Sequence, residues 1–251
     1  MNLIGSAVSS PLRKSEIIRL LELRILAGEF AAGQKLPSER ELADEYGVSR
    51  PVIREGLSGL VERGLVDIQA GRGTFVREVA VDELSHSLNR AAARTGITTR
   101  HLVEARLMVE VTAARYAAAA PQRPMEGLDE VLLRHEEAQS LVDRASTDLQ
   151  FHEAVAAASG NPVIALMFGS IRAQVYSLML RSHSDPHVRE IGDPQHRKLT
   201  EAIRAGDADL ASTLMADHLS LALSLFGEDV DRPISEMLES RGISGAPPLG
   251  I

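Results

Sequence analysis

The sequence predicts a mainly α-helical protein in two parts, an N-terminal winged helix-turn-helix domain and a C-terminal all-α helical bundle. Three observations support this prediction. Leu36–Gly64 has the pattern of two short helices joined by a tight turn. Two short strand-like runs joined by a glycine-rich loop follow directly. From residue 98 onward, apolar residues recur at helical spacing almost throughout.

Composition narrows the class of protein. The chain has 251 residues, which suits one large domain or two smaller ones, and 44% of them are hydrophobic. It contains no cysteine, so disulfides, thiolate metal ligands and a cysteine nucleophile are excluded. The first residues do not resemble a signal peptide, and no apolar run reaches the roughly 20 residues of a membrane span. We therefore expect a soluble, cytoplasmic protein.

Charge is distributed unevenly along the chain. The net charge is −8, yet residues 1–78 contain as many basic as acidic side chains, so the remainder carries all the excess acidity. Two domains with different partners explain this asymmetry most simply. The predicted organisation is a DNA-binding domain at 1–78, a linker at 79–97, an effector-binding and dimerisation domain at 98–228, and a flexible tail at 229–251.

The first domain has clear helix boundaries. A helix over Leu12–Ala27 is predicted from apolar residues at helical spacing, and Gly28 stops it. Ser38 and Glu41 form a capping-box pattern at the start of the next helix. Gly47 ends that helix and supplies the turn.

Ser49 is expected to cap the second helix of the motif, with Pro51 in its first turn, where a missing N–H costs little. Gly56 lies inside this helix and costs about 1 kcal/mol relative to alanine, so we interpret it as a site of close packing. The apolar stripe expected to be buried is Ile53, Leu57, Leu60 and Val61. Strands are predicted over Leu65–Gln69 and Thr74–Arg77, joined by a glycine-rich hairpin loop.

Several side chains of this domain suit contact with DNA. Arg50 and Arg54 are four residues apart, so they share one helix face, and arginine is the best bidentate reader of guanine. Any one of these arginines alone is better explained as an ordinary solvated surface residue. Arranged around a second helix and a wing, the set predicts DNA contact by Arg40, Ser49, Arg50, Arg54, Gly71 and Arg72.

The second part is predicted to be helical without a convincing strand. The linker contains a possible helix at Asp82–Arg94, and the segment after Gly227 is rich in Pro, Gly and Ser and is expected to be loose. The expected helices are Thr98–Ala120, Met125–Ala145, Asp148–Ser159, Pro162–Arg181, Pro194–Ala205 and Ala208–Phe226.

A candidate metal site lies in this part. Asp148 and His152 are four residues apart on one predicted helix, and His196 and His218 can close the site from facing helices. Three imidazoles and one carboxylate suit Zn²⁺, Ni²⁺, Mn²⁺ or Fe²⁺. The alternative is chance, because an Asp–His pair at helical spacing is common. The remaining histidines are expected at the surface or in the linker: His86, His101, His135, His183 and His187.

Two arginines are candidates for binding a ligand carboxylate. Arg106 and Glu110 form a polar pair on an otherwise apolar, alanine-rich helix. A cation on the inward face can meet a carboxylate, although an ordinary intrahelical salt bridge explains the pair equally well. Arg172 on a later helix is a second, weaker candidate.

The segment LPSERELADEYGVSRPVIREGLSGLVERGLVDIQAGRGTFV resembles the winged-helix signature of GntR-type bacterial transcription regulators, with the match running from about Arg13 to Val76. The second half resembles the all-helical FCD effector domain of the FadR-like subfamily. Its marks are EARLMVE (Glu104–Glu110), DLQFHEAVAAASGNP (Asp148–Pro162) and MADHL (Met215–Leu219), with His196 in the expected order.

The resemblance implies functions that residue spacing does not show. It implies DNA contact by Arg40, Ser49, Arg50, Arg54 and the wing around Gly71, and metal ligation by Asp148, His152, His196 and His218. It further implies a small carboxylate effector bound beside the metal, with Arg106 at the position that meets the carboxylate. Homodimers on near-palindromic double-stranded operators are also implied. The chain departs from the family at Gly56, where alanine is usual, and at Ala70, where one member has a base-contacting histidine.

The function we predict is a ligand-responsive transcription regulator, acting as a repressor, and not an enzyme. The alternative is a metal-dependent hydrolase or lyase that carries a winged DNA-binding domain. Against it, the sequence offers no general base beside the proposed metal apart from the ligands, and no nucleophile motif. A purely architectural DNA-binding protein is disfavoured by the separate acidic domain. The sequence does not identify the effector, the operator or the metal.

Overall fold

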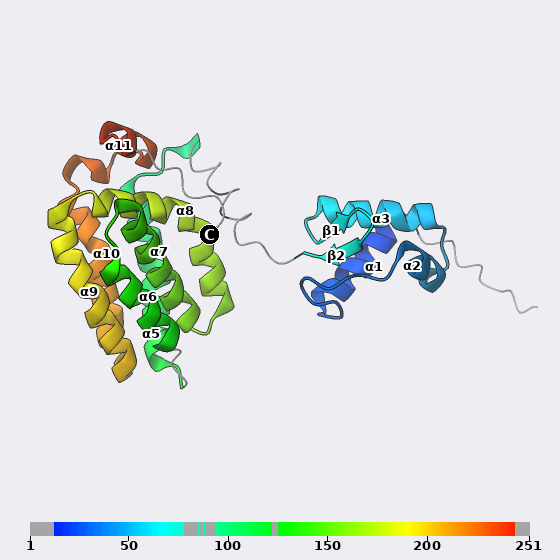
Figure 1. Cartoon of the computed structure of the whole chain (residues 1–251), viewed down its shortest axis with the longest axis horizontal. Coiled ribbons are helices and arrows are strands. Elements are labelled where there is room, and N and C mark those ends of the chain that lie inside the picture. The colour runs from blue at the N-terminus through cyan, green and yellow to red at the C-terminus, as the bar shows by residue number, and fades with distance from the viewer. Residues whose placement is uncertain (1–12, 78–84, 86–87, 89–93, 122–124, 244–251) are drawn as a thin grey trace, which may run out of the picture. The chain divides into compact units, whose positions relative to one another are not determined.

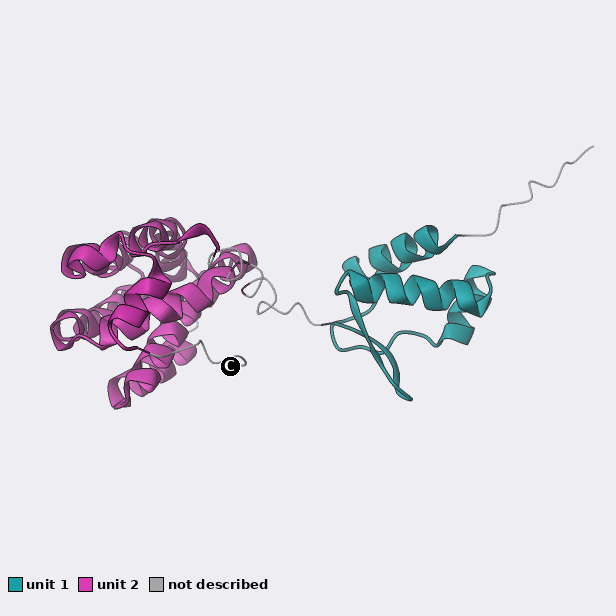
Figure 2. Cartoon of the chain, turned by 90° about the horizontal axis from the view of Figure 1, so that it is seen from above, with its two compact units in different colours: residues 1–80 teal, residues 81–251 magenta. Residues whose placement is uncertain are grey.

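The structure is a computed structural model that describes residues 13–77, 85, 88, 94–121 and 125–243. The chain forms two compact units, residues 1–80 and 81–251, coloured separately in Figure 2. Each unit has its own hydrophobic core, so each is described by itself.

The first unit is a winged helix (Figure 1). Its helices are α1 (Lys14–Leu26), α2 (Glu39–Tyr46) and α3 (Arg50–Glu62), and its strands are β1 (Val66–Gln69) and β2 (Gly73–Val76). The strands pair antiparallel in the register that places Val66 opposite Val76. A further bridge joins Lys35 to Phe75 at the edge of this hairpin. The predicted helix-turn-helix and wing are confirmed.

Close packing between α1 and α3 explains the glycine inside α3. A Cβ at Gly56 would lie 2.6 Å from Cγ2 of Ile17, and one at Gly59 would lie 2.3 Å from Cδ1 of Ile18. Real Cβ atoms do not approach other carbons this closely, so the two helices pack where side chains are missing. The interpretation of Gly56 is confirmed. Val61, by contrast, was expected in the buried stripe but is 39% exposed.

The two helices of the motif begin differently. The Ser38 hydroxyl accepts a hydrogen bond from the Glu41 N–H at 3.3 Å, and the Glu41 carboxylate accepts one from the Ser38 N–H at 2.8 Å. This capping box and the left-handed Gly47 (φ 63°) are as predicted. Ser49 occupies the N-cap position of α3, but its side chain makes no capping hydrogen bond. Ser49 therefore lies at the predicted N-cap position, but its hydroxyl does not make the predicted capping hydrogen bond.

The second unit is an all-helical bundle (Figure 1). Helix α5 lies against α10 and α7, and four alanines on α5 that are fully buried let these helices approach closely. The elements are α5 (Thr99–Ala119), α6 (Met125–Glu137), α7 (Leu141–Ala158), α8 (Pro162–His183), α9 (Pro186–Ala205), α10 (Ala208–Leu225), the 3-10 helix η1 (Gly227–Val230) and α11 (Ile234–Ser240).

Three helix boundaries differ from the sequence prediction. Helix α6 ends at Glu137, whereas the predicted helix ran on to Ala145. Helix α7 begins at Leu141, several residues earlier than expected, because the Ser140 hydroxyl caps it by accepting from the Asp143 N–H at 3.0 Å. Helix α9 begins at Pro186, where the Asp185 carboxylate caps the new helix. It then continues through Pro194, which was predicted to start it.

The C-terminal segment is ordered into η1 and α11, where a loose tail was expected from residue 229. Asp229 is 3% exposed and accepts hydrogen bonds from Nε of Arg181 at 2.9 Å and Nε of Arg241 at 2.6 Å. The N–H of Ile234 also bonds to the carbonyl of Ile97 at 2.9 Å, which ties this segment to the start of α5. Most of the possible helix at 82–94 lies outside the described residues, as do residues 244–251.

Helix α8 is long and apolar enough to cross a membrane, with a mean hydropathy of 1.5 over 18 residues. Half of that window is buried inside the unit, and α8 packs against α7. The core helix of a soluble protein can have the same length and composition.

Candidate functional site

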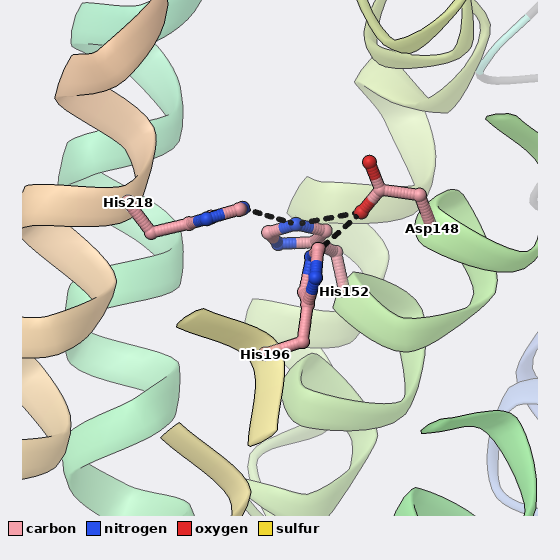
Figure 3. A group of neighbouring side chains, drawn as sticks. All are labelled: Asp148, His152, His196 and His218. Carbon is pink, nitrogen blue, oxygen red and sulfur yellow. Dashed lines mark hydrogen bonds and ion pairs between the residues drawn. The ribbon is translucent and has the colours of Figure 1, made fainter. Parts of the chain in front are cut away.

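Three helices of the bundle bring four potential metal ligands together (Figure 3). Asp148 and His152 lie one turn apart on α7, His196 lies on α9 and His218 on α10. Oδ1 of Asp148 is 3.0 Å from Nε2 of His196 and 3.3 Å from Nε2 of His152. Nε2 of His218 is 3.3 Å from Nε2 of His152. The structure therefore brings together the residues predicted from the sequence.

The other nitrogen of each ring has its own hydrogen-bond acceptor. Nδ1 of His152 donates to the Glu110 carboxylate, and Nδ1 of His196 faces the Asp193 carbonyl at 3.3 Å. Nδ1 of His218 faces the amide oxygen of Gln195 at 3.2 Å. With the Nδ1 protons assigned in this way, the Nε2 lone pairs of His152 and His196 face Oδ1 of Asp148, and that of His218 faces Nε2 of His152.

This donor set fits a divalent metal ion. Nitrogen and oxygen ligands lie about 2.1 Å from such an ion, so adjacent ligand atoms lie about 3.0–3.4 Å apart in octahedral or tetrahedral geometry. The separations of 3.0, 3.3 and 3.3 Å fall in this range. Two lone pairs facing each other at 3.3 Å without a proton would repel, whereas a cation between them satisfies both. Nδ1–H bonds to carboxylate and carbonyl acceptors are also typical outer partners of metal-bound histidines.

The electrostatics of the cluster favour an ionised carboxylate and neutral rings at His196 and His218. Burial alone would raise the pKa of Asp148, but the imidazoles of His196, His152 and His183 hold it well below its ordinary value. Burial lowers the pKa of His218 well below its usual range, and burial together with the neighbouring rings lowers that of His196. Burial would also lower the pKa of His152, but the Glu110 charge outweighs it and raises the pKa.

Two histidines that were expected at the surface are buried beside this cluster. His183 on α8 is 7% exposed, and its Nε2 is 2.9 Å from Oδ2 of Asp148. His135 on α6 is 1% exposed, and its ring packs edge-on against His196 with centroids 4.8 Å apart. The expectation fails because both residues lie on inward helix faces. His101 and His187 are exposed as expected, and His86 lies outside the described residues.

His183 orients the Asp148 carboxylate, because it holds the oxygen of Asp148 that does not face the other rings. His135 and His183 both approach Oδ1 of Asp193, at 3.7 and 3.9 Å, which is too long for a hydrogen bond. His135 is held from its other side by Oγ1 of Thr147 at 3.0 Å. Within α8, His183 follows the helical spacing of the other buried residues. That spacing was the signal in the sequence that could have indicated its burial.

Arg106 and Glu110 form a buried pair at the edge of the cluster. Nε of Arg106 donates to Oε1 of Glu110 at 2.5 Å, and the two side chains are 6% and 1% exposed. Nη2 of Arg106 also lies 3.4 Å from Nε2 of His152. Arg106 therefore faces inward, as one interpretation expected. It also forms the intrahelical salt bridge with Glu110 that the alternative expected.

A cavity of about 50 Å³ adjoins the cluster. Arg106, the four clustered residues and the α8–α9 corner with His183, Arg189 and Asp193 line it. Arg172 does not line this cavity. It pairs with Glu153, with Nε and Oε1 2.8 Å apart, and borders a separate hollow between α7 and α8.

In the first unit, the two arginines predicted on α3 share an acidic partner. Nε and Nη2 of Arg54 donate to the two oxygens of Glu39, at 2.9 and 2.8 Å. Nη2 of Arg50 is 3.6 Å from the same carboxylate. Both arginine side chains are more than 60% exposed, so they remain accessible on the outer face of α3.

The wing and the start of α2 border the same groove as Arg50. Its volume is about 520 Å³, and Arg40, Gly71 and Arg72 line it. Arg72 lies over the ring of Phe75 at 5.6 Å, which places its charge beside the hairpin. Five of the six candidate residues thus lie around one groove or one helix face, and Ser49 is exposed at the start of that helix.

Comparison with known proteins assigns both units. Residues 13–76 match the bacterial regulatory proteins of the gntR family, and residues 101–221 match the FCD domain. Relatives include the HTH-type transcriptional repressor NanR of Enterobacter sp. (strain 638), 35% identical over 80% of each chain. NanR of Cronobacter sakazakii (strain ATCC BAA-894) is 34% identical with the same coverage.

A solved structure agrees with these sequence matches. The Streptococcus agalactiae GntR structure is 26% identical, covers 83% of this chain and 98% of its own length, and superposes with a TM-score of 0.69.

Proposed function

The chain belongs to the GntR family of bacterial regulatory proteins and carries an FCD domain, and from this premise we propose that it is a cytoplasmic repressor whose operator affinity changes when a small carboxylate binds beside a metal ion in the helical unit. The family and the relatives are transcription regulators, so the chain acts as a regulator and not as an enzyme. The close approach of the three Nε2 atoms and Oδ1 of Asp148 is the observation that carries the metal part of this proposal.

Asp148, His152, His196 and His218 would hold the ion, with Glu110 and His183 orienting two of the ligands. A bound divalent ion supplies positive charge and open coordination positions to an anionic effector. Because the protein provides four ligands, an octahedral ion keeps two positions free. That number suits a carboxylate group, which can bind through one or both oxygens.

The cavity lining supports an anionic effector. Arg106 and Arg189 line it, and both can donate to a carboxylate. Its volume of about 50 Å³ accommodates a carboxylate group or one to two waters, whereas small-molecule sites usually exceed roughly 300 Å³. A larger effector therefore requires the α8–α9 corner to open. Pro194 removes one backbone hydrogen bond from α9 beside this corner.

Exposed Arg40, Arg50, Arg54 and Arg72, together with the wing around Gly71 and the helix start at Ser49, would contact the operator. We expect the functional form to be a homodimer on a near-palindromic site, because a two-fold pair of winged helices reads two half-sites. Effector binding and DNA binding must be coupled reciprocally, so an effector that weakens DNA binding is itself bound more weakly by the DNA complex.

A thermal-shift screen tests the effector part of the proposal. The full-length metal-loaded protein is screened with small hydroxy, sugar and dicarboxylic acids, because a ligand that binds the native state raises the melting temperature. Each hit is then added to a DNA-binding assay with a duplex selected by the wild-type protein from a random pool. We expect at least one carboxylate to raise the melting temperature and to shift the DNA affinity.

His218→Ala should abolish the shift caused by that carboxylate, whereas the matched variant His187→Ala, at an exposed position on α9, should retain it. A carboxylate shift that is equal in both variants would contradict a site at the cluster.

A further inference from the structure

Glu39 is the acidic residue of the predicted DNA-binding face that both arginines of α3 approach. It is the first residue of α2, where the Ser38–Glu41 capping box fixes the helix start and the helix dipole favours a carboxylate. Its side chain is 28% exposed, less than half the exposure of either Arg50 or Arg54. Hydrogen bonding from Arg54 lowers the pKa of Glu39 below its usual value, so it is ionised at neutral pH.

The bond to Glu39 selects which edge of Arg54 remains available. A guanidinium group has a side edge, formed by Nε and Nη2, and an end, formed by Nη1 and Nη2. Glu39 occupies the side edge with two hydrogen bonds of 2.9 and 2.8 Å. The end is left exposed on the outer face of α3, with both Nη1 protons and one Nη2 proton. The O6 and N7 atoms of a guanine accept hydrogen bonds from two parallel N–H groups of this kind.

We propose that Glu39 is a specificity-determining residue, which holds Arg54 end-on for a guanine and keeps α3 from binding any phosphate indiscriminately. The inference rests on the proposed operator binding and adds a role for an acidic side chain on a surface that must meet an anion. Fixing the guanidinium removes rotamer freedom before binding, which favours the one geometry that reads a base. The negative charge of Glu39 also opposes non-specific attraction of Arg50 and Arg54 to the DNA backbone.

Loss of the Glu39 charge and loss of the fixed guanidinium change two different quantities, namely the affinity for non-operator DNA and the preference for the operator sequence. Without the Glu39 charge, attraction to any duplex rises. Without the fixed guanidinium, the preference for guanine at one position falls. A surface ion pair with no recognition role would change neither preference, because exposed pairs contribute little by themselves.

The test compares Glu39→Gln with wild type on the full-length protein. The probes are the duplex selected by wild type, a scrambled duplex of the same length, and versions of the selected duplex with each guanine replaced in turn. We expect Glu39→Gln to bind scrambled DNA about two- to threefold more tightly and to lose about tenfold in the ratio of selected to scrambled affinity. The penalty for replacing one guanine in each half-site should shrink, while other positions keep their penalties.

Glu62→Gln is the matched control, since it removes the same charge at an exposed position near the far end of α3. It should leave the discrimination ratio and the guanine penalties unchanged. Glu39→Asp keeps the charge on a shorter side chain and should restore part of the discrimination. Melting temperatures equal to wild type for all three variants confirm that the comparison concerns folded protein.

Unchanged discrimination in Glu39→Gln, or an equal rise in affinity for selected and scrambled duplexes, overturns this inference alone. A wild-type protein that prefers no duplex over any other overturns the proposed function, and the inference with it.

Discussion

Each unit contains an arginine–glutamate pair, one on the surface and one in the interior. In the winged unit, Nε of Arg54 bonds Glu39 on the surface, where the arginine side chain is 63% exposed. In the helical unit, Nε of Arg106 bonds Glu110 in the interior, where the arginine side chain is 6% exposed. Water screens the first pair, whereas burial makes each partner of the second depend on the other.

This difference indicates where each unit can tolerate change. The winged unit can lose an exposed arginine without losing its fold, because its core of Leu, Ile and Val residues lies on the opposite side of α3. The helical unit buries Arg106 and Glu110 inside its core beside the proposed binding site, so binding and stability would be linked there. A ligand bound there would act directly on the packing of α5, α7, α9 and α10.

The largest stability effect is expected inside the bundle. Arg106→Ala leaves the Glu110 carboxylate buried without its cation and should lower the free energy of unfolding by about 3–5 kcal/mol, measured by denaturant titration. The pKa of Glu110 should rise at the same time, since burial raises it and Arg106 is the main group that lowers it. Arg106→Met combined with Glu110→Gln should recover most of the loss. A loss below about 1 kcal/mol for Arg106→Ala would show that the interior pair behaves like a surface pair.

The corresponding change on the surface should affect binding alone. Arg54→Ala should weaken binding to the selected duplex about tenfold to a hundredfold at matched salt, because one bidentate contact with a base is lost. The unfolding transition should overlay that of wild type. Unchanged DNA affinity would remove Arg54 from the recognition surface, and a lowered transition would contradict the contrast between the two units.

A smaller effect is expected where α1 meets α3. Gly56→Ala introduces a methyl group 2.6 Å from Cγ2 of Ile17 and should lower the free energy of unfolding by about 1–3 kcal/mol. Gly56→Ala together with Ile17→Ala, which removes the Cγ2 atom of this contact, should be destabilised by less than the sum of the two single changes. Full additivity of the two changes would show that the contact does not limit the packing.

The smallest expected effect concerns pH and the C-terminal segment. Burial would raise the pKa of Asp229, but hydrogen bonds from Arg181 and Arg241 outweigh it and lower the pKa. An ionised Asp229 therefore stabilises the fold above its unfolded pKa of about 3.9, and this contribution is lost as the pH falls through the lower folded value. The stability difference between wild type and Asp229→Asn should be present at pH 7 and shrink below pH 4. A pH-independent difference would assign the effect to packing.

Local signals in the sequence were sufficient for the winged unit. The Ser38–Glu41 capping box, Gly47 and the glycine-rich hairpin loop each act over a few residues, and each has its predicted role. In the helical unit, the ligand set followed from helical spacing and the resemblance to a known family. The missed starts of α7 and α9 also had local signals, namely the caps Ser140 and Asp185.

The remaining features depend on contacts between distant segments. His135 and His183 lie on different helices, and their burial follows from how α6 and α8 pack around α7. The order of η1 and α11 follows from Asp229 meeting Arg181, which lies 48 residues earlier in the chain. The Glu39–Arg54 pair joins two helices across the turn. No sequence period encodes such pairings, because they arise only when the helices dock.

The central claim is that the buried cluster holds a metal ion, and metal analysis tests it most directly. The full-length protein is purified without chelator, dialysed, and its metal content per chain measured by mass spectrometry, beside His196→Ala and the exposed-site control His187→Ala. We expect about one divalent ion per chain in wild type and in His187→Ala, and close to none in His196→Ala, because the loss of one ligand weakens binding strongly. Wild-type protein that binds no ion after incubation with Zn²⁺, Ni²⁺, Mn²⁺ or Fe²⁺, or a full complement in His196→Ala, would contradict the account.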